Sequence, residues 1–170
     1  MFPSSDEKYR NLIKEAQQLA DDNVVDVNER QVQLMFFSVG GYPFALHGSN
    51  IREILHIGQI TTIPGVSELF LGVINIRGEI DSVLHLSRLL GCKPFIQTPK
   101  SRIAIAVLDG IRTGIAVDSV DNIIDVAIRT LDHHVASLNE PVRSLACGQV
   151  SFENQIVPLL DLKQIYSRLA

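Results

Sequence analysis

Asp81, Ser82 and His85 have the residue types most suggestive of chemistry, because a serine, a histidine and a carboxylate make up a hydrolase triad. In a triad these side chains converge beside backbone N–H groups that stabilise an oxyanion. Along one expected strand, successive side chains point to opposite faces, so Ser82 would point away from Asp81 and His85. No oxyanion loop accompanies them. We therefore expect no catalysis, and a hydrolase that uses Ser82 and His85 ranks last among the alternatives.

The candidate metal ligands have spacings that metal sites do not use. His133 and His134 are adjacent, and neighbouring residues on a strand point to opposite faces, so they would not share a metal ion. Asp118, Asp121 and Asp125 surround an expected corner but lack the interleaved glycine and closing glutamate of a calcium loop. Solvated carboxylates are expected there. The sequence also lacks a nucleotide-binding glycine pattern, so we expect neither a metal nor another cofactor.

The composition is that of a globular protein with an acidic balance. Of the 170 residues, 46% are apolar and 20% charged, and the net charge is −4. Lys and Arg do not cluster and aromatic residues make up only 6%, which argues against nucleic acid as a partner. A small-barrel nucleic-acid binder remains an alternative. Cys92 and Cys147 lie far apart without ligand spacing, as expected of buried thiols in a reducing cytoplasm.

Nothing in the sequence predicts insertion into a membrane. Residues Met1 to Arg10 are polar and mixed in charge, unlike a signal peptide. The stretch Gln31 to Ile51 lacks Asp, Glu, Lys and Arg, but its polar residues and the run Gly40-Gly41-Tyr42-Pro43 predict a hairpin. A soluble, cytoplasmic protein is expected.

Residues 1–31 predict a helical extension followed by a polar connector. Ser4 and Glu7 have capping-box spacing, and Asp26 to Gln31 is polar. Apolar residues recur between them at helical spacing, at Tyr9, Leu12, Ile13, Ala16, Leu19 and Ala20. We therefore expect an amphipathic helix and a separate β-rich domain at 32–170.

The β-rich domain contains one unit twice. Val32–Ile57 aligns without gaps on Ser101–Val126, and Gly72–Leu90 aligns on Gly148–Tyr166, with apolar residues and glycines at equivalent places. Two matches in the same order predict a tandem duplication of a five-strand unit. The repeat halves are approximately 32–100 and 101–170.

Two-residue turns separate the expected strands. Gly40-Gly41 and Asp109-Gly110 are pairs that fit a right-twisted hairpin. Arg77-Gly78 and Glu153-Asn154 end a second hairpin in each unit, because Gly and Asn tolerate positive φ. The same turn is therefore built twice with different chemistry at its tip.

Each unit ends in a short helix, Leu86–Leu90 in the first and Leu162–Leu169 in the second, and Asp161 caps the second helix. Five short strands can close a small barrel that is filled by side chains and has no free edge. We therefore expect a mainly β fold in which each unit closes its own barrel.

Asn75-Ile76-Arg77-Gly78 forms a hairpin tip in the first unit. Taken alone, this is a turn in which Gly78 supplies the backbone geometry and Arg77 is solvated. The equivalent tip of the second unit places Glu153 where the first has Arg77. A duplicated scaffold whose halves differ at exposed tips would offer different surfaces to different partners, which favours an adaptor.

The run Gly72-Val73-Ile74-Asn75-Ile76-Arg77-Gly78 resembles the Gly-Val-x-Asn-Leu-Arg-Gly signature of the CheW coupling-protein family. The resemblance extends over Val32 to Ala170. Further matching segments follow the family's order: Tyr42-Pro43-Phe44-Ala45-Leu46, Ile51-Arg52-Glu53-Ile54, Ile63-Pro64, Val117-Asp118-Ser119-Val120 and Val157-Pro158-Leu159-Leu160-Asp161-Leu162.

This resemblance implies two tandem five-stranded SH3-like barrels and a non-enzymatic adaptor in bacterial chemotaxis signal transduction. The implied partners are the regulatory domain of a CheA-type histidine kinase, itself similar in fold, and the cytoplasmic tip of a chemoreceptor. The protein would then lie in the cytoplasm at membrane-associated receptor arrays. The partner-binding residues carried over are Ile51, Glu53, Val73, Asn75, Arg77 and Gly78. We also expect Glu53 to pair with Arg77 and to stiffen the receptor-facing surface.

The chain departs from the family pattern at two places. Asp81-Ser82-Val83-Leu84-His85-Leu86 stands where the first half of the family commonly reads Val-Pro-x-x-Asp-Leu, and His47 stands where an acidic residue is usual. Both put the ordinary kinase-facing contacts in question. Together with the N-terminal helix, they resemble coupling proteins of type IV pilus (twitching) systems, which is the alternative within this class.

Overall fold

The N-terminal unit is built on a helix. The computed structural model describes residues 5–22 and 29–169, and the chain divides into the units Met1–Arg30 and Gln31–Ala170. Helix α1 spans Ser5–Asp22 and confirms the predicted helix, while the predicted cap Ser4 and most of the connector lie outside the described residues. Across the described ranges, no helix combines the length and the hydropathy that a membrane span requires.

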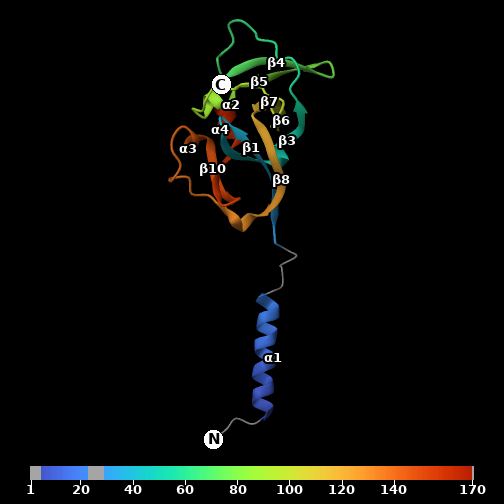
Figure 1. Cartoon of the computed structure of the whole chain (residues 1–170), viewed down its shortest axis with the longest axis vertical. Coiled ribbons are helices and arrows are strands. Elements are labelled where there is room, and N and C mark those ends of the chain that lie inside the picture. The colour runs from blue at the N-terminus through green and yellow to red at the C-terminus, as the bar shows by residue number, and fades with distance from the viewer. Residues whose placement is uncertain (1–4, 23–28, 170) are drawn as a thin grey trace. The chain divides into compact units, whose positions relative to one another are not determined.

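The larger unit contains two antiparallel-rich sheets and short helices (Figure 1). In order across the first sheet, the strands are β8 (Ser119–Ala127), β1 (Gln31–Val39), β2 (Tyr42–His47), β11 (Gln155–Leu160), β10 (Ala146–Phe152) and β9 (Leu131–Asp132). The second sheet runs β3 (Ile51–His56), β6 (Arg102–Leu108), β7 (Ile111–Val117), β5 (Glu79–Leu84) and β4 (Phe70–Ile76). The remaining elements are α2 (Leu86–Leu89), α3 (Val142–Leu145), α4 (Leu162–Ser167) and the 3₁₀ turns η1 (Gly48–Asn50) and η2 (Ile128–Thr130).

The mainly β fold is confirmed, but the prediction that each unit closes its own barrel is wrong. The β1–β2 hairpin of the first unit pairs with β8 and β11 of the second, and Figure 1 shows β1 beside the orange β8. The β6–β7 hairpin of the second unit pairs with β3 and β5 of the first. The first sheet therefore combines one hairpin of the first repeat with four strands of the second, and the second sheet combines one hairpin of the second repeat with three strands of the first.

The apolar pattern of β1 and β6 explains this exchange. On β1, Leu34 and Phe36 face the inside of the first sheet, while Met35 and Phe37 face a core shared by both sheets. On β6, the isoleucines of Arg102–Leu108 face inside the second sheet and its buried alanines face the shared core. A strand with two apolar faces must be covered on both, and pairing with the other repeat provides a layer for each face.

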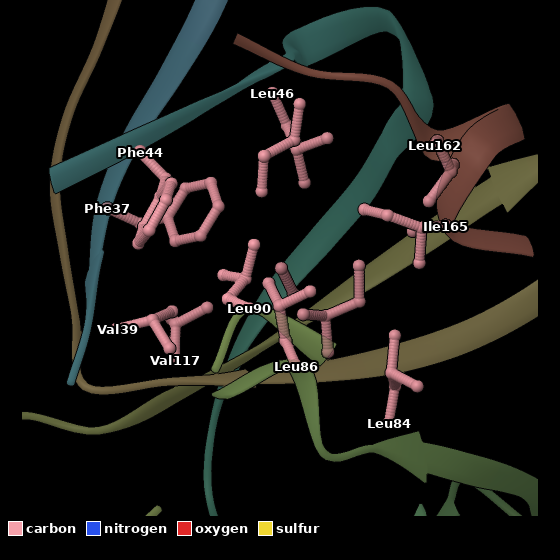
Figure 2. Packing of buried hydrophobic residues seen from close by; sticks show 14 of the residues in the cluster. Phe37, Val39, Phe44, Leu46, Leu84, Leu86, Leu90, Val117, Leu162 and Ile165 are labelled. Carbon is pink, nitrogen blue, oxygen red and sulfur yellow. The ribbon is translucent and has the colours of Figure 1, made fainter. Parts of the chain in front are cut away.

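The shared core draws on nearly every element of the larger unit. Figure 2 shows Phe37 and Phe44 side by side, and their ring centroids lie 6.2 Å apart. The helices contribute Leu86 from α2 and Ile165 from α4, both fully buried. Asp161 caps α4 by accepting a hydrogen bond from the Lys163 N–H, which confirms the predicted cap.

All four hairpins turn through two residues at positive φ, the conformation that matches the right-handed twist of the strands. Glycine fills one or both places in three of these turns, and Asn154 does so in the fourth. Arg77 and Glu153 also adopt positive φ, at 51° and 48°. The tips that differ in charge are therefore displayed on the same backbone.

Both repeats use the same geometry to bring the chain segment after one edge strand across to the other side of the sheet. After β3, Thr61 exchanges two backbone hydrogen bonds of 2.9 Å with Val73 on β4. After β8, the equivalent chain segment forms β9 and pairs with β10. A Cβ on Gly72 would collide with the Thr61 carbonyl, and one on Gly148 would lie 2.7 Å from the Asp132 carbonyl oxygen. Both repeats therefore need glycine where the closing segment crosses.

We predict that Gly72→Ala lowers the free energy of unfolding by about 3 kcal/mol or more, because it combines a φ of +147° with a backbone clash. Gly41→Ala is the matched control, since its φ is +83° but no atom lies within 4 Å of the added Cβ. The control should lose only about 1–2 kcal/mol. Urea denaturation measures both, and equal losses would contradict a special role for Gly72 in closure.

Candidate functional site

The tip of the β4–β5 hairpin is closed by its own asparagine. Asn75 Oδ1 accepts a hydrogen bond of 2.9 Å from the Gly78 N–H. A short polar side chain that accepts from the turn backbone is a common way to stabilise a tight turn. Gly78, at a φ of 85°, completes the turn and leaves Arg77 at its outermost point.

Arg77 forms a bidentate ion pair with Glu53, as predicted from the sequence. Its Nη1 and Nη2 atoms donate to the two carboxylate oxygens of Glu53 at 3.2 and 3.0 Å. The Arg77 side chain is 75% exposed and that of Glu53 is 22% exposed. Such a pair contributes about 0–1 kcal/mol to stability. Its effect is geometric, because β3 and β4 are the two outer strands of the second sheet and the pair joins them.

The other two predicted residues flank this pair without bonding to it. Ile51 lies two residues before Glu53 on β3, and both residues line one hollow in the surface. The Ile51 side chain is partly buried against the shared core. Val73 lies two residues before Asn75 on β4 but lines a separate apolar hollow with Ile63. Hydrogen bonds thus join Glu53 to Arg77 and Asn75 to Gly78, while Ile51 and Val73 flank them.

A second charged cluster beneath the tip was missed at the sequence level. Arg112 on β7 donates from Nε to both carboxylate oxygens of Asp81, at 2.9 and 3.0 Å, and from Nη1 to Glu79. Hydrogen bonding to Asp81 raises the pKa of Arg112. The sequence contained a signal for this cluster, because Asp81 aligns with Val157 of the second repeat, which is buried. A carboxylate at a buried strand position requires a cationic partner.

The candidate triad residues have separate partners. Asp81 is bound by Arg112, and the His85 Nε2 accepts a hydrogen bond of 3.2 Å from the Phe95 N–H. Ser82 lines the apolar hollow beside Val73. The three side chains therefore do not converge on one point.

His47 and His85, which depart from the family pattern, both have partly buried imidazole rings. Burial lowers the pKa of His47, and nearby Asp161 opposes that shift. Burial also lowers the pKa of His85, with the positive charge of Arg88 acting in the same direction. Because the His85 Nε2 accepts from Phe95, the neutral ring is the form that the fold holds.

The carboxylates near β8 and β9 are hydrogen-bonded. Asp118 accepts from the Gly41 N–H at 3.2 Å and Asp121 from the Ser38 hydroxyl at 2.9 Å, so these corner groups are more than solvated charges. Hydrogen bonds, chiefly from the His134 backbone, lower the pKa of Asp132 to about 2.

Among the described residues, no group of three or more His, Cys, Asp or Glu side chains could hold a metal. Burial raises the pKa of both cysteine thiols.

Large apolar side chains are exposed at equivalent places on the two sheets. Tyr42 and Ile156 lie on the neighbouring strands β2 and β11 and line one hollow. Their counterparts in the duplication are Ile111 and Ile80, on the neighbouring strands β7 and β5. All four side chains are more than half exposed. Exposed apolar pairs of this kind are candidates for protein contacts.

The family model for the CheW-like domain matches residues 33–170. The chain belongs to the CheW-like family. It is therefore a non-enzymatic adaptor of chemotaxis signalling. A probable chemotaxis protein CheW of Rhizobium etli is 26% identical over 144 residues, which cover 85% of this chain and 93% of the relative. A chemotaxis protein CheW of Rhizobium meliloti is 28% identical over 134 residues, covering 79% and 86%.

The fold is also that of a solved CheW-like protein. The crystal structure of scaffolding protein TtCheW from Thermoanaerobacter tengcongensis superposes with a TM-score of 0.72 at 22% identity, covering 81% of this chain and 88% of that one. A weaker likeness exists to the protein PilI of Pseudomonas aeruginosa, 24% identical over 112 residues that cover 66% of this chain and 63% of the relative. The more extensive CheW matches favour the chemotaxis assignment over the pilus alternative.

We predict that His85 makes folding stability fall on acidification. Since its pKa is lowered in the fold, the unfolded chain takes up a proton first as the pH drops below about 6.5, and stability is lost from there downward. His85→Gln keeps an acceptor and a donor but does not titrate, so it should lose less stability between pH 7 and 5. Urea unfolding at several pH values measures this, and parallel pH profiles would contradict it.

Proposed function

We propose that this adaptor links the cytoplasmic tip of a chemoreceptor to the regulatory domain of a CheA-type histidine kinase. The observation that carries the proposal is the bidentate pair of Glu53 with Arg77, formed within the segments that match the family signature. The pair holds a cationic, largely exposed side chain in one position on the protein surface. A fixed charge at a hairpin tip suits orientation of a partner more than it suits fold stability.

The proposed receptor-facing surface consists of Ile51, Glu53, Val73, Asn75, Arg77 and Gly78. Asn75 and Gly78 set the backbone of the tip, and Glu53 orients Arg77. Ile51 and Val73 add apolar surface on either side of this polar centre. Polar groups that set orientation and apolar groups that exclude water are the usual division of work in a protein interface.

The proposed kinase contacts use the exposed apolar pairs Tyr42–Ile156 and Ile80–Ile111. They occupy equivalent strands on the two sheets, so each sheet can pack against a barrel of similar fold. Since Tyr42 and Ile156 lie on the first sheet and the Glu53–Arg77 tip belongs to the second, receptor and kinase can bind together. Binding to receptor tips would place the protein in the cytoplasm at membrane-associated arrays.

Arg77→Glu is predicted to weaken binding of a soluble fragment that carries a chemoreceptor's cytoplasmic tip by about tenfold or more, equivalent to about 1.4 kcal/mol. It reverses the charge and replaces the ion pair by repulsion from Glu53. Glu153→Arg, the reverse change at the equivalent tip of the second repeat, is the matched control and should bind as wild type. Calorimetric titration measures both, and wild-type affinity of Arg77→Glu would remove Arg77 from the interface.

Replacing an exposed isoleucine by aspartate should weaken kinase binding, and at Ile156, which lies on the other sheet from the receptor-facing tip, it should leave receptor binding unaffected. Ile80→Asp and Ile156→Asp each place a charge in an apolar contact, and we expect at least one to weaken binding of the kinase regulatory domain about tenfold. Both sites are exposed, so the fold should persist. Wild-type kinase affinity in both variants would contradict the use of these patches.

A further inference from the structure

Next to its tip, the β4–β5 hairpin is held by ion pairs of Glu79 and Asp81 with Arg112, which link the two repeats. We propose that Arg112 is a positioning residue for the docking tip, Asn75–Gly78: by binding Asp81 and Glu79 it determines where Arg77 stands. This inference rests on the proposed function of the tip. It assigns a role to residues that lie outside the family signature.

The guanidinium of Arg112 is held at three nitrogen atoms. Nε and Nη2 both contact the Asp81 carboxylate, and Nη1 contacts Glu79. Asp81 is buried, and the Arg112 side chain is 20% exposed. A planar guanidinium bound on two edges by two carboxylates has little rotational freedom. Because Glu79 directly follows Gly78, this contact acts at the base of the tip.

Backbone pairing between β5 and β7 does not reach the tip end of β5. The parallel register of β5 with β7 joins Val83 to Gly114 and Leu84 to Ile115, at the end of β5 away from the tip. Nearer the tip, the Arg112 side chain bridges the two strands. On the opposite side, Arg77 is bound by Glu53 of β3. The tip is therefore held from both neighbouring strands by charge-assisted hydrogen bonds.

The second repeat forms the equivalent hairpin, β10–β11, with neutral residues in place of this ion pair. The residues that align with Glu79, Asp81 and Arg112 are Gln155, Val157 and Pro43. Val157 is fully buried in the apolar interior of the first sheet. The fold thus accepts neutral residues at these positions. Since a buried ion pair stabilises little compared with apolar residues but does restrict geometry, its presence beneath Arg77 points to positioning of that tip.

The decisive variant is Asp81→Val combined with Arg112→Met, which removes both charges together and leaves neither buried alone. We expect it to fold with a Tm close to that of the wild type. Amide hydrogen exchange at residues 75–79 should become about tenfold faster, and affinity for the soluble chemoreceptor-tip fragment should fall about tenfold. Unchanged exchange or unchanged affinity in the folded variant would overturn the proposal.

Arg112→Lys tests the same idea if the double variant does not fold. Lysine keeps the charge beside Asp81 but cannot form the bidentate contact, so binding should weaken about threefold with the fold intact. Arg102→Lys, a change of the same type on β6, is the matched control. In an Arg77→Ala background, Arg112→Lys should cause no further loss. A loss of equal size in both backgrounds would show that Arg112 does not act through Arg77.

The two proposals fail in distinguishable ways. If the wild-type protein does not bind the receptor fragment, the proposed function fails. Hydrogen exchange of the tip in the free protein then still tests Arg112, because it needs no partner. If the wild type binds and the variants bind equally well, the proposed function stands and the role of Arg112 is refuted.

Discussion

Burial of β1 and β6 on both faces is the constraint on which the rest of the structure depends. Each strand sends one set of side chains into its own sheet and the alternate set into the core between the sheets. Burying each large apolar side chain contributes about 1.5–3 kcal/mol, so neither face can be left in water. The exchange of hairpins between the repeats meets this demand and makes the two sheets one interdependent body.

The features common to both repeats are those that the backbone requires. Gly72 and Gly148 allow the closing segment to cross each sheet, and both tips turn through residues at positive φ. Substitution of Gly72 or Gly148 affects the fold itself, because an added Cβ would meet a backbone carbonyl. The side chains at the tips carry no such requirement, and the repeats have diverged there in charge, with Arg77 in one and Glu153 in the other.

This division explains how a symmetric frame supports an asymmetric function. The tip with Arg77 is anchored to Glu53 on one side and, through Glu79 and Asp81, to Arg112 on the other. The equivalent tip with Glu153 stands on neutral neighbours. The same frame also carries matching apolar pairs on both sheets. Unlike surfaces on one frame suit an adaptor that binds two different partners.

Local and periodic features were determined by the sequence alone: helix α1, the cap of α4 by Asp161, the two-residue turns, the duplication and the family signature from which the Glu53–Arg77 pair was predicted. These follow from neighbouring residues, from spacing or from a motif. Only the tertiary structure decided that the hairpins exchange, that Asp81 binds Arg112 and that Val73 lines a different hollow from Ile51 and Glu53. The alternation of apolar residues shows which face of a strand is buried, but the strand that covers it comes from far along the chain and is selected by packing.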